Sequence, residues 1–165
     1  MTKSANSVKL LIEFLDQAFN ARAWHGTTLR GSVRNVDYKE ANWRPTARHH
    51  NIREITLHAA YWKYIIYRKV SGKTDISFPY PGNNWPKLTG AFDKKTWDKD
   101  KALLNKYHDL LIAELKSFPD SKLESFPPKS KFKYSKYLLG IGSHDLYHAG
   151  QIQLLKRLKR GGVVK

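Results

Sequence analysis

The sequence contains no cysteine among its 165 residues. This absence excludes disulfide bonds, thiolate metal ligands and a cysteine nucleophile, and it argues against a small secreted scaffold. No run of eighteen apolar residues is present, so we expect no membrane-spanning helix. The first ten residues also lack the apolar block of a secretory signal. Together these absences predict a cytoplasmic protein.

Acidic residues are scarce, since 14 Asp and Glu stand against 30 Lys and Arg, and the formal net charge is +16. The positive electrostatic potential produced by this charge favours anionic partners. The basic residues are spread along the chain, with modest clusters at 129–136 and 156–165, and no nucleic-acid-binding motif accompanies them. Of the explanations for this net charge, we therefore favour surface charge without a dedicated partner. An anionic small substrate is the second explanation, and binding to nucleic acid is the third.

Apolar residues, at 41% of the chain, recur with helical spacing in four segments, about 7–21, 51–70, 97–118 and 134–159. Linkers at 22–50 and 120–133 separate them and contain glycine or proline. The length suits one domain over residues 1–165. The pattern predicts an all-α fold, a four-helix bundle.

The longest interruption, 71–96, contains three prolines and three glycines and cannot be regular. A twenty-residue helix is ~30 Å long, and an extended chain returns along it in about ten residues at ~3.3 Å each. We therefore expect a long crossover between the second and third helices, which then run parallel. Because the interruption is longer than this return requires, its remaining residues can cover a site.

Two histidines, His144 and His148, lie four residues apart on the last predicted helix and so share one face. A third, His58, falls between Ile55 and Trp62 on the inward stripe of the second helix. Such histidines are either hydrogen-bonded core residues or metal ligands, and burying an unpartnered imidazole costs roughly 1–3 kcal/mol. We favour a three-histidine metal site with an open position, the arrangement of catalytic rather than structural sites.

Imidazole ligands suit zinc or nickel, with iron and copper as alternatives, and spacing does not choose among them. Asp145 follows His144 directly, as in phosphohydrolases whose adjacent His and Asp both bind metal. The helix turns it about 100° from the histidine face, so we place it behind the ligands or at the surface. Glu54, one turn before His58, is a candidate for orienting that ring, and a solvated glutamate is the preferred interpretation. His108 is expected on the outer side of its helix.

Segment 78–85 is a candidate for covering the site. The side chains that are candidates for lining the pocket or contacting the metal ligands are His50, Glu54, Tyr61, Trp62, Asp145, Tyr147 and Gln151. The H-E-x-x-H motif, a glycine-rich phosphate loop and the G-x-S-x-G elbow are all absent. The sequence therefore identifies no catalytic side chain, and a metal-bound water or thiol is the expected nucleophile.

Four blocks of the sequence, 24–31, 41–45, 50–63 and 142–152, resemble the DinB-like (YfiT-like) superfamily. The resemblance implies an up-down-down-up four-helix bundle, a homodimer, and nickel or zinc held by His58, His144 and His148. Characterised relatives include transferases and isomerases that use bacillithiol or mycothiol. No residue here identifies a thiol-binding subfamily, so the reaction rests on likeness of fold.

The leading hypothesis is a metal-dependent enzyme, a hydrolase or a thiol-dependent S-transferase, that activates water or a thiol toward a small molecule. That substrate is expected to be anionic or a low-molecular-weight thiol. The alternative is a non-catalytic metal- or ligand-binding bundle of a stress response, and a basic nucleic-acid-binding protein is less favoured. The sequence does not determine the substrate, the metal or the general base.

Overall fold

A computed structural model describes residues 6–20 and 23–161. Its elements are α1 (Ser7–Phe19), α2 (Leu29–Val33), α3 (Tyr38–Asn42), α4 (Ile52–Ser71), α5 (Lys94–Leu115), the 3-10 turn η1 (Asp120–Lys122) and α6 (Tyr134–Arg160). These ranges contain no β-strand and one isolated bridge, between Ala23 and Gly26. The all-α prediction is confirmed. None of the described helices has the length and apolar character needed to cross a membrane.

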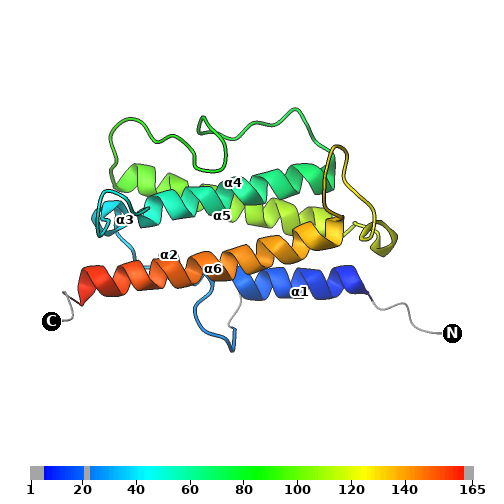
Figure 1. The fold of residues 1–165 in the computed structure, drawn as a ribbon, viewed down its shortest axis with the longest axis horizontal. Coiled ribbons are helices and arrows are strands. Elements are labelled where there is room, and N and C mark those ends of the chain that lie inside the picture. The colour runs from blue at the N-terminus through cyan, green and yellow to red at the C-terminus, as the bar shows by residue number, and fades with distance from the viewer. Residues whose placement is uncertain (1–5, 21–22, 162–165) are drawn as a thin grey trace.

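The four long helices lie along one another (Figure 1). α4 packs against α5 and α6, and α1 packs against α6. In Figure 1, α4 and α5 run in one direction, whereas α1 and α6 run in the other. The segment 72–93 returns along the bundle between α4 and α5, as expected of a long crossover.

Side chains that cap the helices determine where these helices begin. Some helices therefore begin or end at residues other than the predicted ones. α4 begins at a capping box, in which Asn51 accepts from the Glu54 backbone N–H and the Glu54 carboxylate accepts from that of Asn51. α5 begins at Lys94, three residues earlier than predicted, because Asp93 accepts from Thr96 N. α1 ends at Phe19, and Ala21, its predicted end, lies outside the described residues.

The predicted linker 22–50 is not irregular throughout, since it holds α2 and α3, each five residues long and capped by Thr28 and Asp37. α2 packs on α6, and α3 packs on α4. Helices of this length are too short to show a periodic apolar pattern, so hydrophobic spacing does not detect them.

The core forms two apolar clusters along the bundle. One includes Phe19, Leu29, Trp97 and Ile152, and the other includes Leu15, Tyr64, Leu111 and Leu138. Buried polar side chains of α4 and α6 accompany these apolar residues. They form the candidate site and a second polar cluster beside it.

Candidate metal centre

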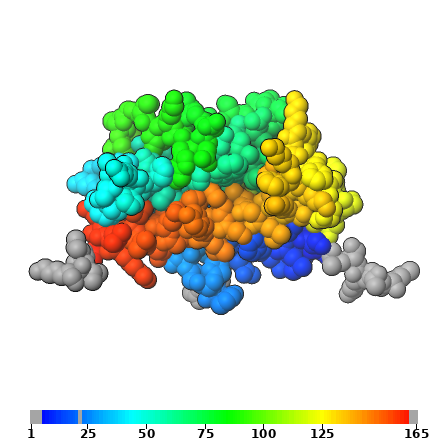
Figure 2. Space-filling model, viewed as in Figure 1, coloured from blue at the N-terminus to red at the C-terminus, as the bar shows by residue number. Residues whose placement is uncertain are grey.

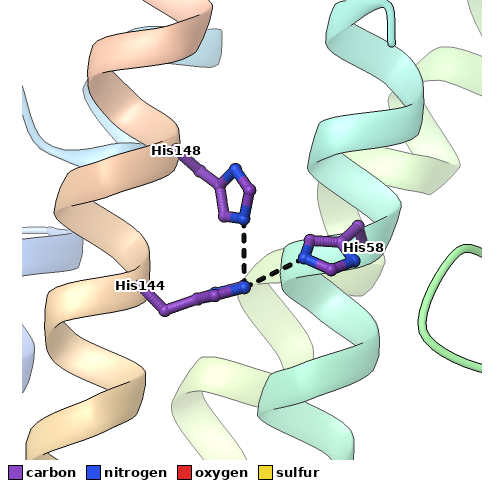
Figure 3. Close-up of side chains that lie close together, drawn as sticks. All are labelled: His58, His144 and His148. Carbon is purple, nitrogen blue, oxygen red and sulfur yellow. Dashed lines mark hydrogen bonds between the residues drawn. The ribbon is translucent and has the colours of Figure 1, made fainter.

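Three histidines from two helices converge (Figure 3). His58 projects from α4, and His144 and His148 project from neighbouring turns of α6. The Nε2 atom of His144 lies 3.0 Å from Nε2 of His58 and 3.0 Å from Nε2 of His148. His58 and His148 are buried and His144 is half-buried. The structure thus brings together the three residues singled out by the apolar stripes, as a group able to hold a metal ion.

The outer nitrogens of two rings contact carbonyl oxygens. Nδ1 of His58 lies 2.7 Å from the backbone oxygen of Asn84, and Nδ1 of His148 lies 2.7 Å from Oε1 of Gln151. A carbonyl oxygen can only accept, so each Nδ1 carries the proton and each Nε2 presents a lone pair. Nδ1 of His144 is buried and has no hydrogen-bond partner in the part of the chain that the structure describes.

Burial keeps the rings uncharged. It lowers the pKa of His58 to about 4 and that of His144 to about 3, and neighbouring imidazoles add to the effect. Burial also lowers the pKa of His148. All three are therefore neutral imidazoles at pH 7, the form that binds metal ions.

The hydrogen-bond pattern of the triad is incomplete without a cation. His144 has one ring proton when neutral, and even on Nε2 that proton serves one of the two 3.0 Å contacts. The other contact then opposes two lone pairs. Ligand nitrogens ~2.0–2.1 Å from a tetrahedral zinc ion are about 3.3 Å apart, close to the separation found here. The three residues therefore fit a divalent cation.

Residues 83–85 of the crossover, here called the strap, cover His58. The Trp85 indole stacks on His58 with ring centroids 4.0 Å apart and on His50 with centroids 3.5 Å apart. Since two rings cannot occupy the same space, the two histidines lie on opposite faces of the indole. Asn84, at a left-handed φ of 55°, also accepts from Trp62 Nε1 through its side chain at 2.8 Å.

Glu54 makes no hydrogen bond to His58, so the less favoured alternative, that it orients this ring, is wrong. Its carboxylate accepts from the Arg44 guanidinium at 2.9 Å and lies 3.2 Å from Nδ1 of the exposed His50. The capping box also holds it. Glu54 therefore orients His50 at the rim of the site rather than a ligand.

The remaining aromatic candidates lie beside the site. Tyr61 packs edge-on against Trp62 and Phe78. Tyr147 is exposed, and its ring meets that of His148 edge-on, with centroids 5.1 Å apart.

A second buried polar cluster lies next to the triad in sequence, and pattern reasoning missed it. Lys63 Nζ donates to Oδ2 of Asp145 at 2.5 Å and lies 3.2 Å from Nδ1 of His108. The surface position allowed for Asp145 and the outer position expected for His108 are both wrong, since both side chains are buried. The available signal was Lys63 itself, which falls at helical spacing after Ile52, Ile55 and Ala59 on the buried side of α4.

Burial lowers the pKa of Lys63 and raises that of Asp145, and the attraction between the two charges opposes both effects. Lys63 Nζ and Asp145 Oδ2 lie 2.5 Å apart and form an ion pair. The carboxylate of Asp145 is therefore engaged by Lys63 rather than free to bind a metal ion. The ring of His108 stacks on Phe19 at 3.8 Å. Asp145 therefore ties α6 to α4 from a position next to the ligands.

The model of the DinB superfamily matches residues 21–152 of the chain. This range runs from α2 through most of α6 and contains all three histidines. A search of curated proteins found no match, and a search of solved structures found none either. The family match covers most of the chain and agrees with its helical fold and with the blocks around the histidines. The chain belongs to the DinB superfamily.

Proposed function

We propose that the chain is a metal-dependent enzyme in which His58, His144 and His148 hold a divalent metal ion, nickel or zinc. The observation that carries the proposal is the convergence of three Nε2 atoms from uncharged rings, with too few protons to satisfy their contacts. The expected reaction is hydrolysis or thiol transfer on a small molecule.

A bound divalent ion would supply a Lewis acid that lowers the pKa of water or a thiol. The residues of the chain prepare its place. Asn84 and Gln151 hold the Nδ1 protons of His58 and His148, which turns the Nε2 lone pairs inward. Trp85 shields His58 from solvent.

Charge favours an anionic substrate. The three ligands are neutral, and the carboxylate of Asp145 is neutralised by Lys63. The positive charge of an ion here would therefore remain uncompensated by the protein, which favours an anion at an open position. The net charge of +16 would also draw anions toward the molecule.

We further propose that residues 1–165 form one domain with the up-down-down-up arrangement of a four-helix bundle. The directions of α1, α4, α5 and α6 in Figure 1 support this arrangement.

Metal analysis of protein purified without an affinity tag tests the metal site. We expect about one nickel or zinc ion per chain, almost none in His144→Ala, and an unchanged content in His49→Ala. His49 is an exposed histidine outside the triad and serves as the matched control. A wild-type protein that stays metal-free after incubation with both ions would refute the metal site.

Turnover tests the catalytic part of the proposal. In a screen of low-molecular-weight thiols and hydrolysable anionic esters, His144→Ala should abolish any activity found while preserving helicity. Turnover in metal-depleted His144→Ala equal to that of the metal-loaded wild type would contradict the mechanism.

A non-catalytic role for the metal is the second candidate, because the triad joins α4 to α6 and the strap covers His58. Chelation separates the two functions. A structural ion should lower the melting temperature sharply on removal, whereas removal of a catalytic ion should leave folding nearly intact.

A further inference from the structure

A polar groove lies between α2 and the first half of α5. It has a volume of about 1140 Å³. The charged and amide side chains that line it include Arg30, Arg34, Asn35, Asp98, Lys101 and Asn105. None of its lining residues belongs to the triad, to the strap or to the buried cluster around Lys63. A groove of this size suits a small molecule rather than a single ion.

Positive charge prevails in this groove. Three of the four charged side chains that line it are cations. Asp98, the carboxylate among them, already accepts from Lys101 at 3.0 Å and from Lys94 at 2.7 Å. The charges of Arg30 and Arg34 are therefore not compensated within the groove. Concave surfaces lined by one sign of charge focus the electrostatic potential and attract counter-ions, so the groove favours an anionic ligand.

The two arginines have unused hydrogen-bond donors. Nη1 of Arg30 donates to Oδ1 of Asn20 at 2.6 Å, which restrains this side chain at the groove. The other N–H groups of Arg30, and all five of Arg34, have no acceptor among the described residues. The side-chain amides of Asn35 and Asn105 make no hydrogen bond to that part of the chain either. The groove therefore presents an excess of donors.

The donors of the groove match phosphoryl groups. A guanidinium is a planar fork that donates two parallel hydrogen bonds to phosphoryl oxygens. A diphosphate offers more acceptor oxygens and more charge than a carboxylate does, and it extends over a longer span. Arg30 and Arg34, four positions apart, can each bind a different phosphoryl group of one ligand. We propose that this groove binds the diphosphate or triphosphate group of a small molecule, at a site separate from the metal centre.

An exposed tryptophan lies beside the groove. Trp24 is 94% exposed, and Ala23 and Gly26, on either side of it in sequence, line the groove. A bridge between Ala23 and Gly26 closes this short loop. Segment 23–28 projects at the bottom of the molecule in Figure 2, in blue. An indole at this position can stack on a planar ring that is attached to the phosphates, as in a nucleotide.

Calorimetric titration of the full chain with inorganic pyrophosphate, at about 150 mM salt, tests the site. Arg30→Gln and Arg34→Gln should each weaken binding about tenfold, because each removes charge-assisted hydrogen bonds. The double variant should show no measurable binding. Circular dichroism should show unchanged helicity in all three variants, since both side chains are exposed.

Two further variants separate a specific site from the general attraction of a basic protein. Arg48→Gln/Arg157→Gln is the matched control, because it also removes two exposed arginines, and both lie outside the groove. It should bind pyrophosphate as the wild type does. Arg30→Lys keeps the charge but loses the fork, so its affinity should fall between those of Arg30→Gln and the wild type.

Two further ligands identify the chemistry of the molecule that carries the phosphates. If ADP binds more tightly than pyrophosphate and loses this advantage in Trp24→Ala, the ligand is a nucleotide. If ADP binds no more tightly, the ligand is a polyphosphate without a stacking ring. Citrate, whose charge lies on carboxylates, should bind at least about tenfold more weakly than pyrophosphate.

Four results would overturn the inference. They are a wild type that binds neither pyrophosphate nor ADP, an equal loss in the double variant and its matched control, citrate binding as tight as that of pyrophosphate, and a loss of pyrophosphate binding in His144→Ala. The last result would place the anion at the metal centre. We expect His144→Ala to bind pyrophosphate as the wild type does, so failure of the metal site and failure of this groove are separate outcomes.

Discussion

Two buried polar clusters involve α4 and α6, and they differ in whether their groups attract one another. The triad combines three like groups, His58, His144 and His148, whose Nε2 atoms meet. The other combines opposite charges, Lys63 and Asp145, with His108 beside them. Asp145 directly follows His144 in sequence, so one turn of α6 contributes to both.

This difference distinguishes the Lys63 cluster, which stabilises the packing of α4 against α6, from the triad, which can bind a ligand. In the Lys63 cluster, the ammonium has a carboxylate acceptor and a ring nitrogen, although Oδ1 of Asp145 and Nε2 of His108 have no hydrogen-bond partner among the described residues. In the triad, lone pairs face one another and Nδ1 of His144 has no partner among the described residues. Opposite charges that pair within the core indicate a structural contact, whereas convergent lone pairs with no cation between them indicate a binding site.

The largest expected effect comes from breaking the ion pair of the Lys63 cluster. Lys63→Met or Asp145→Leu should each lower the free energy of unfolding by about 3–5 kcal/mol, because each leaves an unpaired charge fully buried. The double variant should lose much less than the sum of the two, since it removes both charges. Urea unfolding at pH 7 measures all three. Single variants within about 1 kcal/mol of wild type would show that the pair does not stabilise the fold.

The second prediction concerns acid stability and compares the two clusters through their histidines. Burial lowers the pKa of His108 to about 2, with help from the charge of Lys63. Below an unfolded pKa of about 6.5, the unfolded chain binds a proton that the folded chain does not. Stability is therefore full above pH 6.5 and falls as the pH drops from there toward 4, by up to about 1.4 kcal/mol per pH unit for each such histidine.

His108→Phe should make this decline shallower in urea titrations of metal-free protein, because one of the buried histidines is removed. The slope should not vanish, since His58 and His144 also have lowered pKa values, of about 4 and 3. An unchanged slope in the variant would mean that His108 becomes protonated in the folded state.

The smallest expected effect separates two ways of orienting a ligand. Gln151→Leu removes the side-chain acceptor of His148 Nδ1 and should weaken metal affinity about tenfold or more. Asn84→Gly keeps the backbone acceptor of His58 and tolerates the positive φ, so its affinity should stay near that of the wild type. Competition with a chromophoric chelator measures both. Equal losses in the two variants would show that the strap, rather than the acceptor atom, controls affinity.

Apolar spacing located the four long helices and placed the three histidines on the inward stripes of two of them. It did so because a stripe repeats over several turns and tolerates errors at single positions. It missed α2 and α3, which are five residues long. It also misplaced His108 and did not decide between a surface and a buried position for Asp145, because one polar residue on a helix does not reveal whether a partner such as Lys63 lies across the core.

The sequence alone determined that the protein is helical, basic and free of cysteine, and that three histidines face inward. Composition and periodicity carry these properties, since each depends on residues near one another in the chain. The tertiary structure decided which nitrogens meet and what holds them. The partner of His58 is the backbone of Asn84, 26 residues away in a crossover without periodic pattern. Contacts of this kind depend on the path of a loop and on the register of two helices, which local patterns do not encode.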